Sequence, residues 1–177
     1  MAEPTVPLSE SPDVQIVSLA ARVGRYGDFA ARLSELLQTR PPEGPRRATA
    51  GGASLLGVGP GRWLAVRDGS APLYEALARP LQGLAAVCDQ GDGYAVFSVE
   101  GSAARRVLSK GVPVDLHPTA FGPDAVAVTL VAHTGAIVWR TEAGFRIAVF
   151  RSYRDSFRHW LDEAAAEFTT TPDEGQG

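Results

Sequence analysis

Residues 97–118 read FSVEGSAARRVLSKGVPVDLHP, and the rest of the chain can be organised around this segment. It continues a strand predicted at Tyr94–Val99, whose side chains alternate between two faces of an extended backbone. Ser102 predicts the N-cap of a helix that begins at about Ala103. Gly111 predicts a left-handed residue after this helix, and the two prolines that follow favour an extended chain. The segment therefore predicts a strand, a capped helix and an extended exit.

The predicted helix has an apolar face and a basic face. Ala104, Val107 and Leu108 recur at helical spacing, whereas Arg105 and Arg106 point away from them. This pattern predicts a helix that packs against a core and exposes its two arginines.

Upstream of this segment, alternating and helical patterns follow one another in the order βαββαβ. They predict strands at 14–23, 54–58, 62–67 and 84–89, a first helix capped by Asp28 and a second helix capped by Ser70. Residues 39–52 carry three prolines and three glycines, and predict a long exposed loop.

Downstream of it, three strands are predicted at 125–131, 136–140 and 145–151, with a turn at His133-Thr134-Gly135. A last helix, capped by Ser152, carries an apolar stripe to Phe168. The rhythm of the first half is thus repeated, which predicts one α+β domain over 14–168 built from two ferredoxin-like halves, at about 14–90 and 91–168. Residues 1–13 and 169–177 are predicted to be disordered tails.

The composition restricts the classes of function. The chain has 177 residues, of which 45% are hydrophobic, and its 17 basic and 20 acidic side chains give a net charge of −3. This balance argues against nucleic acid as a partner, because binding to phosphates needs a basic field. No apolar run approaches the roughly 20 residues that cross a bilayer, and the first residues do not resemble a signal peptide. Since Cys88 is the only cysteine, we expect no intrachain disulfide and a cytoplasmic protein.

No motif in the sequence predicts a catalytic, cofactor-binding or metal site. His117, His133 and His159 each lack a second ligand at metal-binding spacing. The glycines of residues 57–62, GVGPGR, are followed by a strand, which favours a hairpin over a phosphate-binding loop. Cys88 lies in an apolar strand, where we expect a buried and unreactive thiol.

Arginines gather near the last strand and the last helix, at positions 140, 146, 151, 154 and 158. Together they predict a basic face. Such a face is either solvated or a surface for binding a partner, and the residues alone leave both interpretations open.

Four segments carry a resemblance to a known family: LGVGPGRWLAV (56–66), VEGSAARRVLSKGVPVDLHPTAF (99–121), AVAVTLVAHTGAIVWRT (125–141) and FRIAVFRSYRDSFRHWL (145–161). They resemble the gamma subunit of heterotetrameric sarcosine oxidase. That family is similar in turn to the folate-binding domain of the aminomethyltransferase of glycine cleavage, whose halves are ferredoxin-like. The resemblance therefore implies the same duplicated α+β fold that the strand and helix order predicts.

The resemblance implies a non-catalytic subunit of a flavoenzyme that oxidises sarcosine to glycine, hydrogen peroxide and a one-carbon unit for tetrahydrofolate. The implied partners are the alpha, beta and delta subunits. FAD, FMN, NAD, zinc and tetrahydrofolate are expected on those subunits and none in this chain. Which secondary amine is oxidised depends on another chain.

Six exposed polar residues are candidates for the subunit interface: Arg105, Arg106, Asp115, His117, Arg151 and Arg154. For Asp115 and His117, a structural role in the exit loop is the alternative. The alternative function is an autonomous folate-binding or aminomethyltransferase-like one-carbon protein. It would need a pocket carboxylate that holds the pterin, and Asp115 does not match the carboxylate of that family.

Overall fold

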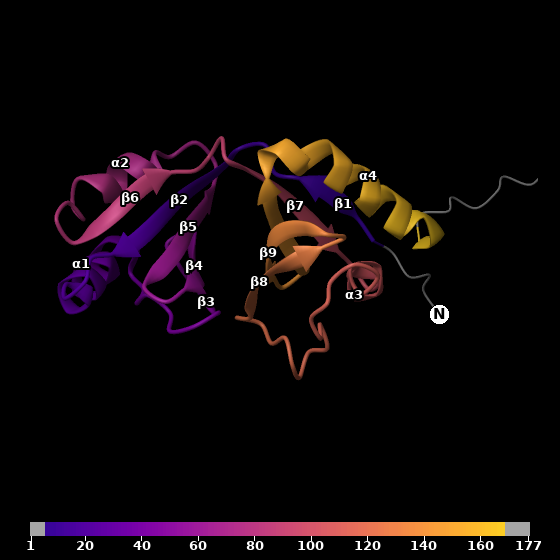
Figure 1. Cartoon of the computed structure of the whole chain (residues 1–177), viewed down its shortest axis with the longest axis horizontal. Coiled ribbons are helices and arrows are strands. Elements are labelled where there is room, and N and C mark those ends of the chain that lie inside the picture. The colour runs from indigo at the N-terminus through magenta and orange to yellow at the C-terminus, as the bar shows by residue number, and fades with distance from the viewer. Residues whose placement is uncertain (1–5, 169–177) are drawn as a thin grey trace, which may run out of the picture.

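The computed structural model describes residues 6–168, which form two five-stranded antiparallel sheets (Figure 1). The N-terminal sheet has the order β3 (Arg47–Ala50), β4 (Ala53–Gly59), β5 (Arg62–Asp68), β2 (Val14–Ala21), β6 (Ala85–Asp89). The C-terminal sheet has the order β1 (Leu8–Glu10), β7 (Tyr94–Glu100), β10 (Gly144–Phe150), β9 (Thr134–Arg140), β8 (Val126–Val131). The predicted α+β class is confirmed.

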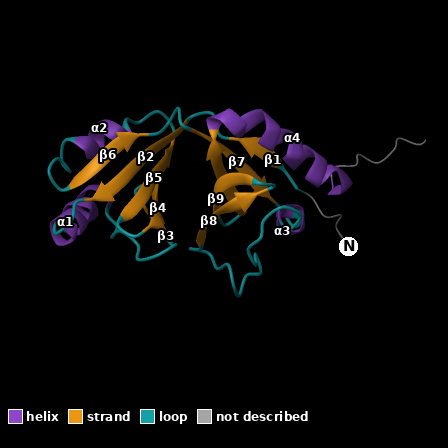
Figure 2. Ribbon diagram, in the orientation of Figure 1, coloured by secondary structure: helices purple, strands orange, loops and turns teal. Residues whose placement is uncertain are grey.

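Helices cover the outer face of each sheet, so the molecule has four layers (Figure 2). The N-terminal sheet carries α1 (Tyr26–Leu37) and α2 (Leu73–Ala78). The C-terminal sheet carries α3 (Ala104–Leu108) and α4 (Arg154–Ala165), and 3-10 turns at Arg151–Tyr153 and Ala166–Phe168 flank α4.

Three apolar layers follow from the alternation of side chains along the strands. Leu33 and Leu77 are buried between the N-terminal sheet and its helices, and Phe157 is buried between the C-terminal sheet and α4. Ile16 and Trp139 lie in the third layer, between the two sheets. Both faces of most strands are therefore buried, which explains why apolar residues occur on both faces in the sequence.

The two sheets repeat one strand order. From β2 and from β7 the order continues through β5 and β10, then β4 and β9, to the outer strands β3 and β8. The remaining position is filled by β6 in one sheet and by β1 in the other. The four-stranded unit predicted for each half accounts for neither β3 nor β1.

The predicted disorder of residues 1–13 is wrong for the described part of that segment. Val6 is buried, and β1 pairs with β7 so that Leu8 lies opposite Val99 (Figure 1). Only the distant β7 offers this pairing, so the local sequence does not reveal it. The disorder predicted for residues 1–5 and 169–177 lies outside the described residues.

The long loop predicted at 39–52 is also wrong in part, because β3 lies inside it and pairs with β4. Gly51 and Gly52 both have positive φ angles, 57° and 76°, and form the two-residue turn between these strands. A Gly-Gly pair is a hairpin signal, but the short RATA strand before it has little strand character of its own.

The four predicted helix caps are wrong. The residues that precede the helices make no side-chain cap, and they are Arg25, Pro72, Ala103 and Tyr153. A distant side chain serves α2 instead: Gln15 Oε1 accepts a hydrogen bond of 2.7 Å from the Leu73 amide. At α2, a tertiary contact thus replaces the predicted local cap.

Gly111 does not adopt the predicted left-handed conformation, since its φ is not positive. Its lack of a side chain has a different cause. A Cβ at this position would overlap the Trp160 indole and lie 3.1 Å from the Ala132 amide nitrogen. Gly111 therefore allows α4 and the end of β8 to approach the α3 exit.

Candidate functional site

β8 is the outer strand of the C-terminal sheet, and its sequence VAVTLV contains no charged residue. The other three outer strands each carry a charge: Glu10 in β1, Arg47 in β3 and Asp89 in β6. Charged residues on an outer strand oppose pairing with other chains. The edge of β8 lacks this protection.

Two apolar side chains of β8 are exposed to solvent. Val128 is 58% exposed and Leu130 is 51% exposed, although Val126 on the same face is buried between the sheets. This face of the sheet continues to Phe150 of β10, which is 52% exposed and stacks on Tyr94. The C-terminal sheet thus extends beyond the area that the N-terminal sheet covers.

The outward-facing backbone of β8 is only partly paired. Ala132 and His133 have positive φ angles and make a two-residue turn to β9, one residue earlier than the predicted turn. At the two ends of the edge, the Val126 amide donates to the Pro45 carbonyl and the Ala132 amide to the Gly111 carbonyl, both at 3.0 Å. Val128 and Leu130 lie between these two ends. Their outward amide and carbonyl groups have no hydrogen-bond partner within residues 6–168.

A first hollow of about 690 Å³ lies beside Val128. Its lining is mostly apolar and includes Tyr26, Pro42, Pro45, Val58, Pro60 and Trp63, with Glu43 as the charged member. The Trp63 indole donates a 3.0 Å hydrogen bond to the Pro42 carbonyl, which holds this loop against β5. A Cβ at Gly57 would overlap the Gly44 carbonyl, so glycine is required for the loop to cross β4 so closely.

A second hollow of about 760 Å³ lies beside Leu130. It is lined mainly by the α3 exit, the end of β8 and Trp160. Its charged member Lys110 forms an ion pair with Glu167 and donates to the Ala164 carbonyl at 2.6 Å. The two hollows therefore flank the exposed part of β8.

Comparison with known proteins identifies the family. The model of the sarcosine oxidase, gamma subunit family matches residues 27–167. The chain belongs to this family. It is 34% identical over 172 residues to sarcosine oxidase subunit gamma of Corynebacterium sp. strain P-1, covering 95% of this chain and 84% of the relative. It is 32% identical to the Arthrobacter sp. subunit gamma over 144 residues, covering 79% and 71%.

Solved structures agree with this assignment. A chain of the heterotetrameric sarcosine oxidase from Corynebacterium sp. U-96 superposes with a TM-score of 0.84 at 29% identity, covering 98% of this chain and 90% of that chain. The glycine cleavage system aminomethyltransferase T from Bartonella henselae superposes with a TM-score of 0.66 at 12% identity, covering 90% and 46%. The second likeness concerns the fold alone, and it confirms the predicted similarity to an aminomethyltransferase.

The predicted interface residues of this gamma-family chain are not gathered at one place. Arg106 lies over the Phe168 ring, with its guanidinium carbon 4.6 Å from the ring centre, and its neighbour Arg105 is exposed. Arg151 and Arg154 lie at the opposite end of α4, a helix of about 18 Å. The six candidates therefore remain a prediction as contacts with a partner.

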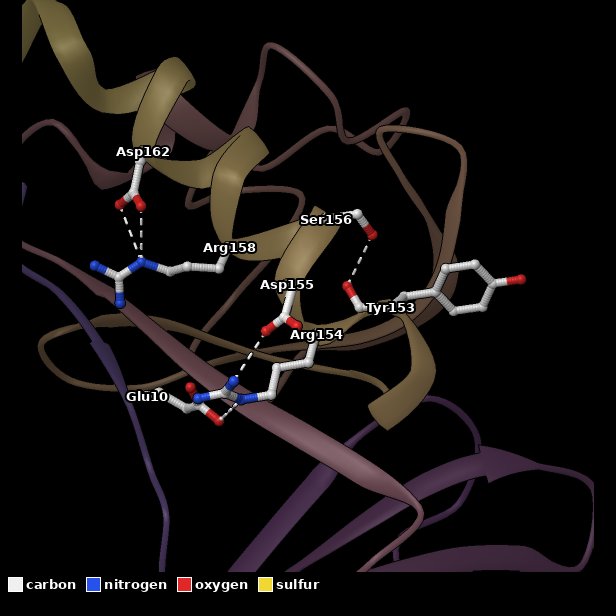
Figure 3. A network of polar contacts seen from close by, with 7 residues as sticks. All are labelled: Glu10, Tyr153, Arg154, Asp155, Ser156, Arg158 and Asp162. Atoms are coloured by element: carbon white, nitrogen blue, oxygen red, sulfur yellow. Dashed lines mark hydrogen bonds and ion pairs between the residues drawn. The ribbon is translucent and has the colours of Figure 1, made fainter.

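Arg154 links α4 to the N-terminal strand, as Figure 3 shows. Its Nε donates a 2.7 Å hydrogen bond to Glu10, and its Nη1 donates to Asp155 at 2.9 Å. The hydrogen bond and the charge of Glu10 raise the pKa of Arg154 above its usual value. Arg151 donates to the carbonyls of Gly91 and Asp92. Both arginines thus connect the start of α4 to distant parts of the same chain.

Asp115 and His117 have structural roles in the exit loop, the alternative left open by the sequence. The Asp115 carboxylate accepts a 2.8 Å hydrogen bond from the His117 amide, and His117 Nδ1 lies 2.7 Å from the Thr119 hydroxyl. These contacts form a local Asx-type turn.

The five arginines predicted to form one basic face do not all share a surface. Arg146 lies between the sheets with 15% of its side chain exposed, and it makes two hydrogen bonds to Asp68 and one to Ser11. Arg140 donates to the Phe121 carbonyl, and Arg158 pairs with Asp162 along α4 (Figure 3). Arg146 therefore acts as an ion-pair link between the two halves.

The predicted burial of Cys88 is wrong, because the thiol is exposed on the outer strand β6.

Within residues 6–168, no group of three or more histidine, cysteine or acidic side chains is placed to hold a metal ion. The same described region contains no helix long and apolar enough to cross a membrane. The open edge of β8 was not predicted from the sequence, although the uncharged run VAVTLV is a signal for it.

Proposed function

We propose that this chain is the gamma subunit of a heterotetrameric sarcosine oxidase and supports assembly of the enzyme without an active site of its own. The observation that carries the proposal is the superposition on a chain of such an enzyme over 98% of the present chain. The partners in this proposal are the alpha, beta and delta subunits.

The surface of the chain supports a docking role. Exposed Val128 and Leu130 lie between two largely apolar hollows, and the centres of protein interfaces are apolar and poor in charge. The proposal accounts for this surface by covering it with another subunit.

The chemistry is assigned to the other subunits. In the proposed complex, sarcosine is oxidised to glycine and hydrogen peroxide, with a one-carbon unit passed to tetrahydrofolate. FAD, FMN, NAD, zinc and tetrahydrofolate bind to those subunits, and the complex works in the cytoplasm. This chain contributes packing surface and structural support.

Co-expression with the three other subunits tests the proposal. We expect a stoichiometric four-subunit complex that releases hydrogen peroxide from sarcosine, measured by size-exclusion chromatography with mass determination and by a peroxide assay. The control omits this chain. An equally stable and equally active flavin complex without it would contradict the proposed role.

A ligand-binding function is the second candidate, and the first hollow favours it. A volume of about 690 Å³ suits a small molecule, and the hollow combines Glu43 with Tyr26 and Trp63. A carboxylate beside aromatic rings could hold a pterin. Calorimetry of the isolated chain with tetrahydrofolate tests this candidate, with Glu43→Gln as the matched variant. Binding heat that disappears in the variant supports it, and no heat at high ligand concentration removes it.

A further inference from the structure

We propose that β8 binds an extended apolar segment of another oxidase subunit, which adds to the C-terminal sheet as a sixth strand next to Val128 and Leu130. This inference rests on the proposed function, because it names the surface through which the chain joins its complex. It assigns the contact to the main chain of β8 as well as to its side chains.

The main chain of β8 supplies the first argument. The outward amides of Val126 and Ala132 donate to the carbonyls of Pro45 and Gly111, whereas the outward amides and carbonyls of Val128 and Leu130 are bonded to no described residue. A partner that only covered the edge would bury these amide and carbonyl groups without hydrogen bonds, which is costly. A partner strand satisfies them, as in other cases where a peptide adds to a sheet edge.

The hollows supply the second argument. Val128 borders one hollow and Leu130 borders the other, and these residues are about 7 Å apart along an extended strand. That distance matches alternate residues of a pairing strand. The segment therefore presents apolar side chains at alternate positions, one toward each hollow.

Charge complementarity supplies the third argument. Glu43 in the first hollow forms no ion pair within residues 6–168, whereas Lys110 in the second is paired with Glu167. The first hollow is thus acidic and the second is neutralised. We expect the partner segment to carry a lysine or arginine next to the apolar residue that faces the first hollow.

Gly135 supplies a fourth observation. It lies directly opposite Leu130 on β9, its φ is not positive, and a Cβ there would meet no atom within 4 Å. Neither the backbone nor packing within the chain requires glycine at this position. Because Gly135 has no side chain, the Leu130 side chain is left uncovered on the β9 side and stays available to a partner.

Two variants in the four-subunit complex test the inference. Val128→Lys places a charge between the hollows, and Leu130→Pro removes an amide that points away from β9, so the internal pairing of the sheet is kept. The matched control is Val23→Lys, which changes a fully exposed valine that lines neither hollow. We expect both β8 variants to assemble about tenfold more weakly than the wild type, and the control to assemble normally. Circular dichroism checks that each variant is folded.

Amide hydrogen exchange gives a readout that does not depend on a variant. The Val128 and Leu130 amides should exchange rapidly in the isolated chain and at least about tenfold more slowly in the complex. If the complex forms but these amides remain unprotected, or if both variants assemble normally, the strand proposal is overturned and the proposed function stands.

Two other outcomes overturn the strand proposal in different ways. If the wild-type chain joins no complex, the proposed function fails together with it. If the isolated chain forms a dimer that Leu130→Pro abolishes, then β8 pairs with a second copy and the occupant is not another subunit.

Discussion

The outer strands β3 and β8 occupy equivalent places in the two sheets but differ in character. β3 has four residues and carries Arg47, whereas β8 has six residues and no charge. They meet at one end, where Arg46 bridges to Ala125 and the Arg47 amide donates to the Asp124 carbonyl. The same topology thus gives one protected edge and one open edge, and the open edge is the one at which we propose docking.

The helices show a second difference between the halves. The N-terminal sheet has a long first helix of 12 residues and a second of 6, whereas the C-terminal sheet has a first of 5 and a second of 12. Each sheet is therefore covered by one long helix, but by a different element. The duplicated strand order therefore does not determine which of the two helices in each half is the long one.

The largest expected effect is a loss of stability, and it compares how much the core under α4 and the core under α1 each contribute to the free energy of unfolding. Phe157→Ala in α4 and Phe29→Ala in α1 each remove a phenyl ring that is at most 1% exposed. Each should lower the free energy of unfolding by about 3–5 kcal/mol, because a cavity remains in a packed layer. Chemical denaturation measures both values. A much smaller loss for one variant would show that its half can rearrange around the cavity.

The next effect concerns the link between the sheets. Asp68→Ala leaves the mostly buried guanidinium of Arg146 without its carboxylate partner. Because Asp68 is itself largely exposed, we expect a loss of about 1–3 kcal/mol, below that for a fully buried pair. Asp162→Ala, which breaks a surface pair along α4, is the control and should cost about 0.5 kcal/mol or less. Equal losses for the two variants would contradict the role of Arg146 as a link between the halves.

Two glycines near β8 differ in whether packing within the chain requires them. Gly111→Ala would place a methyl group against the Trp160 ring and should cost about 1–3 kcal/mol. Gly135→Ala meets open space, so the isolated chain should be unchanged or more stable by up to about 1 kcal/mol. Thermal unfolding compares the two variants. A clearly destabilised Gly135→Ala variant would indicate a packing role for this glycine within the chain.

The smallest effect is a pH dependence in the C-terminal sheet. Burial raises the pKa of Tyr94 above its usual value of 10.0, so the folded state holds this proton more tightly than the unfolded state. The contribution is complete below pH 10.0 and is lost as the pH rises further. Tyr94→Phe should remove this alkaline loss, seen by comparing thermal unfolding of both proteins from pH 8 to pH 11. Identical curves for the two proteins would contradict it.

Local patterns predicted much of the fold. Alternation located β4, β5 and β7, and helical spacing identified Leu73, Leu77 and Leu81, all of which are fully buried. The strand β1 pairs with the distant β7, so its pairing could not be predicted from the local sequence. The strand β3 pairs with its neighbour β4, but its own four residues have little strand character. The predicted cap of α2 failed because the contact that serves this helix, Gln15 to Leu73, comes from elsewhere in the chain.

The candidate site was the least predictable part. Val128 and Leu130 were correctly placed in a strand, but their exposure follows from the position of β8 at the end of its sheet. The arginines were predicted as interface residues because their charge can be read directly from the sequence. In the structure, Arg154 and Arg151 make internal bonds instead.

The N-terminal strand has a consequence for biosynthesis. β1 leaves the ribosome first, yet its partner β7 is synthesised roughly ninety residues later. The N-terminal sheet contains all its own strands and can close while β1 waits. The C-terminal sheet can form only after β8, β9 and β10 have been made, so it should fold later than the N-terminal sheet.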